Sequence, residues 1–266
     1  AGIGLNVSAE ATGGSVENAR HIKNKTMEIG FVESLVADWA YKGEEYFKSG
    51  PVQNIRGFIA LYPNTIQTVV KANSGIKTYK DLKGKKVACG IQGSSSVLNM
   101  KIVLESYGVP FSDIKAQYLA YGPAMELLKD GQVDAVMVDA GAPNSSIIDI
   151  GTQHKINILS IDRANIAEIV KKYPFFSAAT VIPKGTYKGI DYDVVTTGSL
   201  ATLCVQAELP DDLVYKMIKT LFDKKADVVK VHEKGKSIDL KTAVNGFSIP
   251  LHPGVIKYYK EKGVLK

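Results

Sequence analysis

The sequence predicts an α/β protein with two lobes. Short apolar runs alternate with segments of helical periodicity along most of the 266 residues, as in sheets whose strands are joined by helical crossovers. The lysine- and glycine-rich residues 83–86 separate two such series, and the turn-like residues 196–199 end the second. We therefore expect mostly parallel sheets, a first lobe of residues 1–84 and 200–266, and a second lobe of residues 85–199.

The first series alternates strand and helix patterns in chain order. Leu5, Val7 and Ala9 alternate with polar residues, which is the period of a half-buried strand. After a glycine-rich turn, apolar residues recur at the spacing of one helical face. The expected strands are residues 5–9, 29–32, 55–62 and 66–70, and the expected helices begin at Val16 and cover residues 35–47.

The second series and the tail follow the same logic. A helix from residue 97 has apolar positions three and four apart and is stopped by Gly108 and Pro110. Strands are expected at residues 86–90, 118–119, 135–138, 156–161, 178–182 and 200–205. Helical segments are expected at residues 79–82, 97–107, 124–129, 147–151, 164–172, 213–221, 228–231 and 254–262.

The composition excludes several classes of protein. With 45% apolar and 23% charged residues the chain is an ordinary globular protein, and no apolar run approaches the ~20 residues of a membrane span. The net charge is +6, but the 33 basic residues include only three arginines, so we expect no nucleic-acid partner. Four scattered histidines and two cysteines predict no metal site. Cys89 and Cys204 fall in expected strands, which favours two buried thiols over a disulfide.

Two strand-to-helix junctions are the features most suited to binding chemistry. One contains Gly13, Gly14 and Ser15, and the other contains Gly93 followed by three serines. Glycines let a backbone approach a ligand closely, and the free N–H groups and dipole of a helix start favour an anion. Either junction alone is more often a tight turn with a capping serine. Two in one chain favour a ligand site.

The chain resembles the solute receptors of TAXI-type TRAP transporters. The resemblance rests on the run from Ala9 to Asn18 and on six further runs, and it extends in order over essentially the whole chain. The further runs are residues 54–63, 74–85, 128–135, 140–143, 182–187 and 250–254.

This resemblance implies a type II periplasmic-binding-protein fold, in which a small solute lies in a cleft between two α/β lobes. It implies a receptor without a cofactor that presents glutamate, glutamine or a similar carboxylate such as 2-oxoglutarate to the membrane subunits of a TRAP transporter. It also implies a periplasmic or otherwise extracytoplasmic location, with a precursor that could be membrane-anchored. Because receptors of this family begin with a further strand, glycine-rich turn and helix, we expect that this N-terminal strand–helix is missing here.

The junctions and the resemblance together define the expected ligand site. Where the family usually has Gln-Ser-Asp or Gln-Asn-Asp, this chain has Glu33-Ser34-Leu35, and the Gly-Ser-Gly-Thr-Glu pattern is replaced by residues 93–97. A carboxylate at Glu33 predicts an α-amino acid ligand with its amino group near Glu33. The alternative is that Glu33 points to solvent or pairs with a nearby lysine. The expected ligand-binding residues are Gly13, Gly14, Ser15, Asn18, Glu33, Tyr62, Gly93, Ser94, Ser95, Ser96, Tyr121 and Gly141.

Two other functions are compatible with such a fold. The first is an enzyme of the transferase or precursor-synthesis type that acts on a small anionic substrate. An enzyme needs a titratable group with a positioned partner, and the sequence shows no such pair. Asp134 and Asp139 flank one expected strand and are better explained as turn carboxylates. The second is the sensing domain of a regulator, which would need a DNA-binding extension.

Overall fold

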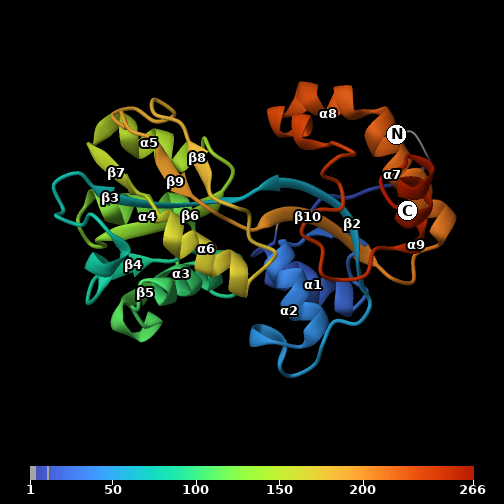
Figure 1. Ribbon diagram of the computed structural model, residues 1–266, viewed down its shortest axis with the longest axis horizontal. Coiled ribbons are helices and arrows are strands. Elements are labelled where there is room, and N and C mark those ends of the chain that lie inside the picture. The colour runs from blue at the N-terminus through green and yellow to red at the C-terminus, as the bar shows by residue number, and fades with distance from the viewer. Residues whose placement is uncertain (1–3, 11) are drawn as a thin grey trace. The chain divides into compact units, whose positions relative to one another are not determined.

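The computed structural model describes residues 4–10 and 12–266 and divides into two compact units. Unit 1 comprises Ala1–Tyr62 and Leu200–Lys266, and unit 2 is the continuous segment Pro63–Ser199. Figure 1 shows the elements of both units. Each unit combines helices with its own sheet, as the alternating sequence pattern predicts.

Unit 1 is built on a three-stranded sheet in the order β1-β10-β2. β1 pairs with β10 in antiparallel fashion, with Gly30 opposite Cys204. The strands are β1 (Ile29–Phe31), β2 (Ile55–Pro63) and β10 (Leu200–Gln206).

The helices of unit 1 bury an apolar cluster against this sheet. Phe58 of β2 and Val205 of β10 pack with Val214 and Ile218 of one helix and Val255 of another. These two helices, α7 and α9, lie side by side (Figure 1). The tail therefore belongs to unit 1. The helices are α1 (Ser15–Lys23), α2 (Ser34–Lys42), α7 (Asp211–Asp223), α8 (Lys225–Val231) and α9 (Pro253–Glu261), with 3₁₀ turns η1 (Glu45–Phe47) and η4 (Glu233–Ser237).

Unit 2 is built on a five-stranded mixed sheet in the order β5-β4-β6-β3-β7. β4 runs parallel to β5 and β6, whereas β3 runs antiparallel to β6 and β7. A separate pair, β8 and β9, is antiparallel. The strands are β3 (Thr65–Lys71), β4 (Lys86–Ala88), β5 (Lys115–Gln117), β6 (Ala135–Ala140), β7 (Ile156–Leu159), β8 (Thr180–Ile182) and β9 (Val194–Thr196).

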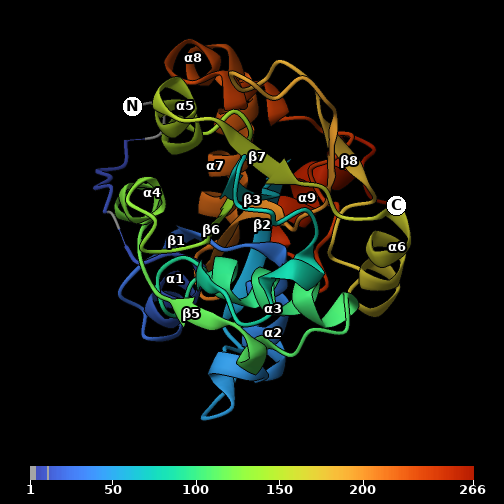
Figure 2. The same ribbon diagram turned by 90° about the vertical axis from the view of Figure 1, so that its left-hand side faces the viewer.

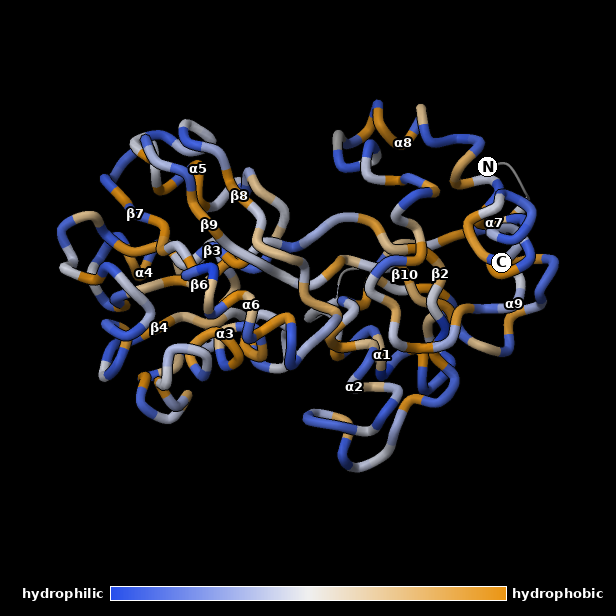
Figure 3. The backbone as a smooth tube through the Cα atoms, in the orientation of Figure 1, coloured by the Kyte–Doolittle hydropathy of each residue, from blue (hydrophilic) through white to orange (hydrophobic). Residues whose placement is uncertain are grey.

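Helices cover both faces of this sheet. Val136 and Val138 of β6 pack on one face with Met125 and Ile147. The alternate residues of β6 point to the other face, where α3 contacts the strand (Figure 2). Hydrophobic stretches coincide with these helices and strands, and the turns between them are mostly hydrophilic (Figure 3). The helices are α3 (Ser95–Ser106), α4 (Tyr121–Lys129), α5 (Ser145–Gln153) and α6 (Arg163–Lys172), with 3₁₀ turns η2 (Tyr79–Leu82) and η3 (Phe111–Asp113).

Several details differ from the sequence expectations. Residues 63–84, expected in the first lobe, belong to unit 2 because β3 pairs there with β6 and β7. The expected mostly parallel sheet is mixed, because β3 joins it without a helical crossover of its own. Residues 5–9 form no strand; they lie exposed and without a ladder partner in the described part of the chain. The strand expected at 118–119 lies at residues 115–117, and β9 was not expected.

The length and the hydrophobicity of the helices decide whether any of them could span a membrane. In residues 4–10 and 12–266, no helix is long and apolar enough to cross a bilayer.

Candidate functional site

The start of α3 forms the first candidate site, in unit 2. Gly90 and Gly93 have φ values of +95° and +81°, conformations that favour glycine, and Ser94 is the N-cap residue of α3. A Cβ on Gly90 would lie 2.7 Å from Cβ of Ser96. The loop after β4 is therefore packed tightly against the first turn of α3, and glycine is required for that approach.

A network of hydrogen bonds holds this first turn in place. Ser96 Oγ lies 2.8 Å from the Tyr121 hydroxyl, which donates to the Asp139 carbonyl at 3.0 Å and accepts from the Asp139 N–H at 3.1 Å. Since the single Tyr121 proton goes to that carbonyl, Ser96 donates to Tyr121. The Asn99 amide donates to Asp139 Oδ2 at 2.6 Å. The network therefore fixes α3, α4 and β6 to one another.

Three members of this network are buried, and this determines the electrostatics of the site. Ser96, Asn99 and Asp139 are 3%, 0% and 6% exposed. The first turn of α3 contains no acidic residue, and the leading N–H groups of a helix have no partner within the helix. These N–H groups and the positive end of the helix dipole suit a small oxyanion.

Gly141 marks the end of the neighbouring strand. It follows Ala140 of β6, whose carbonyl accepts from Thr65 Oγ1 and from Gln67 Nε2, both at 3.0 Å. Gln67 in turn accepts a short hydrogen bond from the Tyr187 hydroxyl. Burial raises the pKa of Tyr187 to about 12, so its hydroxyl stays protonated and remains a donor. These bonds fix the backbone just before Gly141.

The glycine-rich turn before α1 forms the second candidate region, in unit 1. The Gly13 N–H donates to the Glu17 carboxylate, and the Gly14 N–H donates to Thr12 Oγ1 at 3.3 Å. Ser15 Oγ accepts from the Glu33 N–H at 3.1 Å. Two donors of this turn are thus used within the protein, whereas at the start of α3 the N–H of the N-cap residue Ser94 donates to the Ile91 carbonyl at 2.9 Å.

Asn18 connects this turn to β1. Its Oδ1 accepts from Thr12 Oγ1 at 2.6 Å, and its Nδ2 donates to the Phe31 carbonyl at 2.8 Å. Asn18 is 7% exposed. The side chain therefore positions both the turn and the strand.

Charged groups gather around Tyr62 at the end of β2. Glu33, which directly precedes α2, is 4% exposed. Burial and the negative charge of Glu33 together raise the pKa of Tyr62. Lys234 Nζ lies 5.6 Å from the centre of the Tyr62 ring. An aromatic ring is thus placed near both a carboxylate and an ammonium group.

The structure distributes the twelve expected site residues between the two units. Gly13, Gly14, Ser15, Asn18, Glu33 and Tyr62 lie in unit 1, and Gly93, Ser94, Ser95, Ser96, Tyr121 and Gly141 lie in unit 2. Sequence reasoning missed Asn99 and Lys234, and it treated Asp139 as a turn carboxylate. No local motif distinguishes these three, because a buried amide, a surface lysine and a strand-end aspartate are common in any α/β protein.

Within the described residues, no three His, Cys, Asp or Glu side chains are grouped as metal ligands. Cys89 and Cys204 are free and buried, and burial raises the pKa of each thiol to about 12. At neutral pH both are therefore protonated and weak nucleophiles.

Comparison with known proteins gives matches over almost the whole chain. The family model described as "NMT1-like family" matches residues 2–263. A curated protein of Escherichia coli strain K12, which is named as an aliphatic sulfonates-binding protein, is 41% identical to this chain over 105 residues. That match covers 40% of this chain and 28% of the relative. The chain therefore spans less than a third of the relative it matches.

Solved structures show similarity of fold at low sequence identity. The periplasmic aliphatic sulphonate binding protein SsuA from Escherichia coli superimposes with a TM-score of 0.55 at 17% identity, over 94% of this chain and 70% of that one. The alkanesulfonate-binding protein SsuA from Xanthomonas axonopodis pv. citri, bound to MOPS, gives a TM-score of 0.52 at 17% identity, over 93% and 70%. At these identities, the likeness shows the fold alone.

Proposed function

The chain belongs to the NMT1-like family and has the two-domain α/β fold of periplasmic binding proteins, and from this premise we propose that it is an extracytoplasmic receptor for a small anionic solute. The family and the fold support a binding protein that works with a membrane transporter. The sulfonate ligands named for the relatives and the carboxylates implied by the sequence resemblance share one chemistry, a compact oxyanion.

The observation that carries this proposal is the start of α3. Its leading N–H groups, the Ser94 hydroxyl and the absence of acidic residues in its first turn suit an oxyanion of a carboxylate or sulfonate. The bond from Ser96 to Tyr121 holds the turn rigid, so little ordering entropy is lost on binding. We assign the anion-binding role to Ser94, Ser95 and Ser96.

Glu33 supports a narrower proposal for the ligand. A buried carboxylate favours an ammonium group and disfavours a second carboxylate. The proposed ligand is therefore an α-amino acid, with glutamine or glutamate preferred to 2-oxoglutarate. In the same proposal Asn18 acts by bracing the turn, and Tyr62 provides an aromatic surface for the ligand.

The transporter partner is a further part of the proposal. The sequence resemblance supports membrane subunits of the sodium-driven TRAP type, and the similarity to sulfonate-binding proteins supports another class of importer equally. Uptake that depends on a sodium gradient would support the TRAP assignment, and uptake that persists without sodium would contradict it.

Calorimetric titration tests the receptor function and its anion site. The probes are glutamate, glutamine, 2-oxoglutarate and ethanesulfonate. We expect one of them to bind. Ser94→Ala removes a hydroxyl donor to the anion, and Ser96→Ala removes the bond to Tyr121 that holds the turn, so each replacement should weaken that binding by about 0.5–1.5 kcal/mol, the scale of one hydrogen bond. Ser106→Ala, at the opposite end of α3, is the matched control and should leave affinity unchanged.

Two outcomes would contradict the proposal. Unchanged affinity in both serine variants would contradict the anion-binding role assigned to the Ser94 and Ser96 side chains. Chemical conversion of the bound compound during incubation, detected by mass spectrometry, would favour an enzyme over a receptor. A melting curve for each variant separates a binding defect from a folding defect, because Ser96 also bonds to Tyr121.

A further inference from the structure

The positive charge of the protein is concentrated in its last 54 residues. Residues 213–266 contain twelve lysines, no arginine and five acidic residues, which gives this segment a formal net charge of +7. The whole chain has a net charge of +6, so residues 1–212 have a net charge of −1. A strong asymmetry of charge along a chain is typical of proteins that contact an anionic partner.

Two helices of this segment carry lysines on their solvent-facing sides. On α7, Lys216 and Lys219 are three residues apart, and both are exposed. On α9, Lys257 and Lys260 have the same spacing and are also exposed. Because residues three apart lie on one side of a helix, each helix turns a pair of ammonium groups toward solvent.

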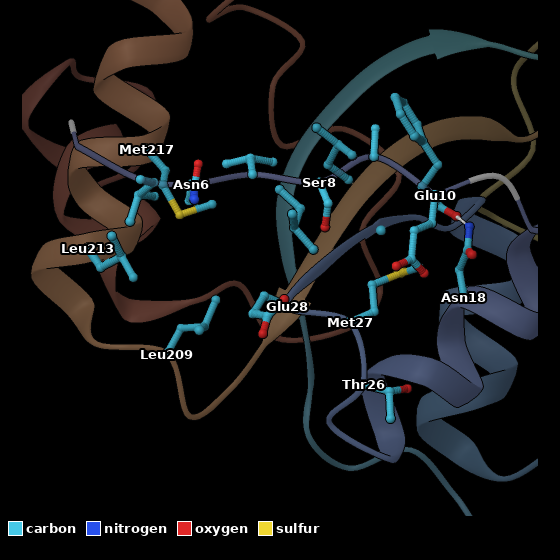
Figure 4. A pocket seen from close by; sticks show the side chains of 17 residues that line it. Asn6, Ser8, Glu10, Asn18, Thr26, Met27, Glu28, Leu209, Leu213 and Met217 are labelled. Carbon is cyan, nitrogen blue, oxygen red and sulfur yellow. Dashed lines mark hydrogen bonds between the residues drawn. The ribbon is translucent and has the colours of Figure 1, made fainter. Parts of the chain in front are cut away.

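The apolar residues of α7 lie on its other sides. Val214 and Ile218 are fully buried in the apolar cluster of unit 1. Leu213 and Met217 line a hollow next to residues 5–10 (Figure 4). The helix is therefore amphipathic, and the side with the lysines is the one that faces solvent.

Contacts between side chains join α7 and α9 into one surface. The Tyr215 hydroxyl of α7 donates to Glu261 Oε2 of α9 at 2.6 Å. Lys257 Nζ of α9 lies 3.7 Å from Asp212 Oδ1 of α7. The two pairs of lysines therefore belong to one face of unit 1. We call it the α7–α9 face and define it by its five lysines, which are Lys216, Lys219, Lys257, Lys260 and Lys262.

The carboxylates among these lysines are already paired. Asp223 Oδ2 lies 2.6 Å from Lys219 Nζ. Glu261 Oε1 lies 3.7 Å from Lys262 Nζ. With the contact between Asp212 and Lys257, three lysines of the α7–α9 face each have an acidic neighbour.

Lys216 and Lys260 carry the remaining positive charge of the face. Neither has an ion pair in the part of the chain that the structure describes. One of them lies on each helix, and both are exposed. An anionic partner can therefore approach these two ammonium groups without breaking an existing ion pair.

The type of basic residue narrows the choice of partner. Arginine holds a single phosphate or carboxylate through two parallel hydrogen bonds, whereas lysine acts as a hydrated point charge on a flexible stem. Residues 213–266 contain only lysine. Lysines on amphipathic helices suit an extended anionic surface, and the headgroups of acidic phospholipids form such a surface.

We propose that the α7–α9 face is a peripheral membrane-contact surface, which binds the headgroups of anionic phospholipids. The contact would be electrostatic and reversible, because the apolar residues of both helices pack into the unit 1 cluster and the lysines are left to solvent. It would hold the protein at a bilayer surface. The face uses none of the residues proposed for the solute, so this role goes beyond solute binding.

Sedimentation of the full chain with lipid vesicles tests the proposal. One set of vesicles contains phosphatidylcholine alone, and the other contains phosphatidylcholine and phosphatidylglycerol in a ratio of about 7:3. We expect binding to the second set only. We also expect release as NaCl is raised from about 0.1 M to 1 M, because the screening length falls from about 10 Å to about 3 Å.

Paired replacements locate the contact on the molecule. Lys216→Gln combined with Lys260→Gln leaves no carboxylate without its partner, and glutamine is a good helix former, so the fold should be kept. Each lysine removed should weaken binding to the anionic vesicles about fivefold, which makes about 25-fold for the pair.

The matched control removes the same charge from unit 2. Lys80 and Lys171 are exposed and have no ion pair among the described residues. Lys80→Gln combined with Lys171→Gln should leave binding to the anionic vesicles unchanged. Melting curves should be the same for both double variants and the unmodified protein, because exposed replacements of this kind change stability little.

Four results would overturn the proposal. Equal losses in the two double variants would mean that net charge alone attracts the vesicles. Equal binding to vesicles of phosphatidylcholine alone would identify an apolar contact. Failure to bind either set of vesicles would exclude a membrane role for the face. Binding to soluble polyglutamate that requires Lys216 and Lys260, without binding to vesicles, would assign the face to an acidic protein.

Discussion

Glu33 is an acidic side chain in a buried position. It is 4% exposed, and its charge contributes to the raised pKa of Tyr62, so the carboxylate lies close to that ring. Burying a charge is unfavourable unless a partner or a ligand compensates for it. This burial excludes the simpler interpretation in which Glu33 points to solvent.

The first prediction concerns the charge of Glu33. Glu33→Gln keeps the shape of the side chain and removes its charge, so glutamine should bind about tenfold more weakly, which is the usual contribution of a charge-assisted hydrogen bond. Affinity for 2-oxoglutarate should hold or rise, because repulsion between carboxylates is removed. Calorimetric titration of both ligands measures the two changes.

A control separates this effect from net charge alone. Glu126→Gln makes the same change at an exposed site that is paired with Lys129, and both affinities should stay as they are. Parallel losses for both ligands in Glu33→Gln would argue against an ammonium-binding role. So would tighter binding of 2-oxoglutarate than of any amino acid to the unmodified protein.

At the residue scale, the sequence predicted where α3 begins but not the side chains that hold its first turn in place. Ser94 to Ser96 begin α3 as expected, because glycine followed by serines is a strong local signal for a helix start. Asp139 and Asn99 become neighbours only when β6 and α3 pack together. Such a pair, distant in sequence, follows from tertiary structure and has no local pattern.

At the scale of single elements, α9 depends on a buried histidine for its start. His252 is the N-cap residue and fully buried, and its Nδ1 accepts from the Gly254 N–H at 3.1 Å. Nε2 lies 3.1 Å from the Leu209 carbonyl, so the neutral ring donates there. Protonation of Nδ1 would remove the acceptor that caps the helix.

The pH dependence of stability follows from this arrangement. Burial lowers the pKa of His252 below its ordinary value of 6.5, although Asp211, 3.8 Å away, opposes the shift. The unfolded chain therefore binds the proton more readily than the folded one. The contribution of neutral His252 to the free energy of unfolding is fully present above pH 6.5. It is lost as pH falls toward the pKa of His252 in the folded protein, with a slope of at most about 1.4 kcal/mol per pH unit.

Denaturant unfolding at several pH values measures this effect. His252→Asn retains an N-cap acceptor but cannot take up a proton, so its free energy of unfolding should fall less steeply below pH 6.5 than that of the unmodified protein. His154→Asn, at an exposed position, should retain the steeper slope. Identical slopes in all three proteins would contradict the assignment to His252.

Helices were predicted well, because their periodicity lies within one segment. Strands were predicted less well, because a strand and its direction depend on pairing with a distant segment. The helix patterns from residue 95 onward match observed helices, because apolar residues that recur every three or four positions define one face of a helix within the segment itself. Residues 5–9 have a strand pattern and no strand, since a strand forms only with a partner. The direction of β3 was missed for the same reason, because alternation carries no information about neighbours.

At the scale of the whole molecule, the division into two units depends on long-range pairing. Residues 63–84 follow a strand of unit 1 directly, and the lysine-rich stretch near residue 84 suggested a later boundary. Pairing of β3 with β6 and β7 places these residues in unit 2. Unit 2 is consequently one uninterrupted segment, with a five-stranded sheet and its own apolar cluster.

The last prediction is that residues 63–199 fold on their own. The segment has the size and the buried core of an independent domain. The fragment should therefore show native-like near-ultraviolet circular dichroism and a single cooperative melting transition. Leu128→Ala, at a position 1% exposed in this core, should lower the free energy of unfolding by about 2–5 kcal/mol in the fragment and in the full chain alike.

An exposed position on the same unit provides the control for that comparison. Ile148 is 43% exposed, and Ile148→Ala should change the free energy of unfolding by about 0.5 kcal/mol or less. If the fragment melted without cooperativity, the core of unit 2 would need unit 1 to be stable. Equal losses for Leu128→Ala in fragment and full chain would instead mean that the apolar cluster forms within residues 63–199, because the cavity would then have the same surroundings in both proteins.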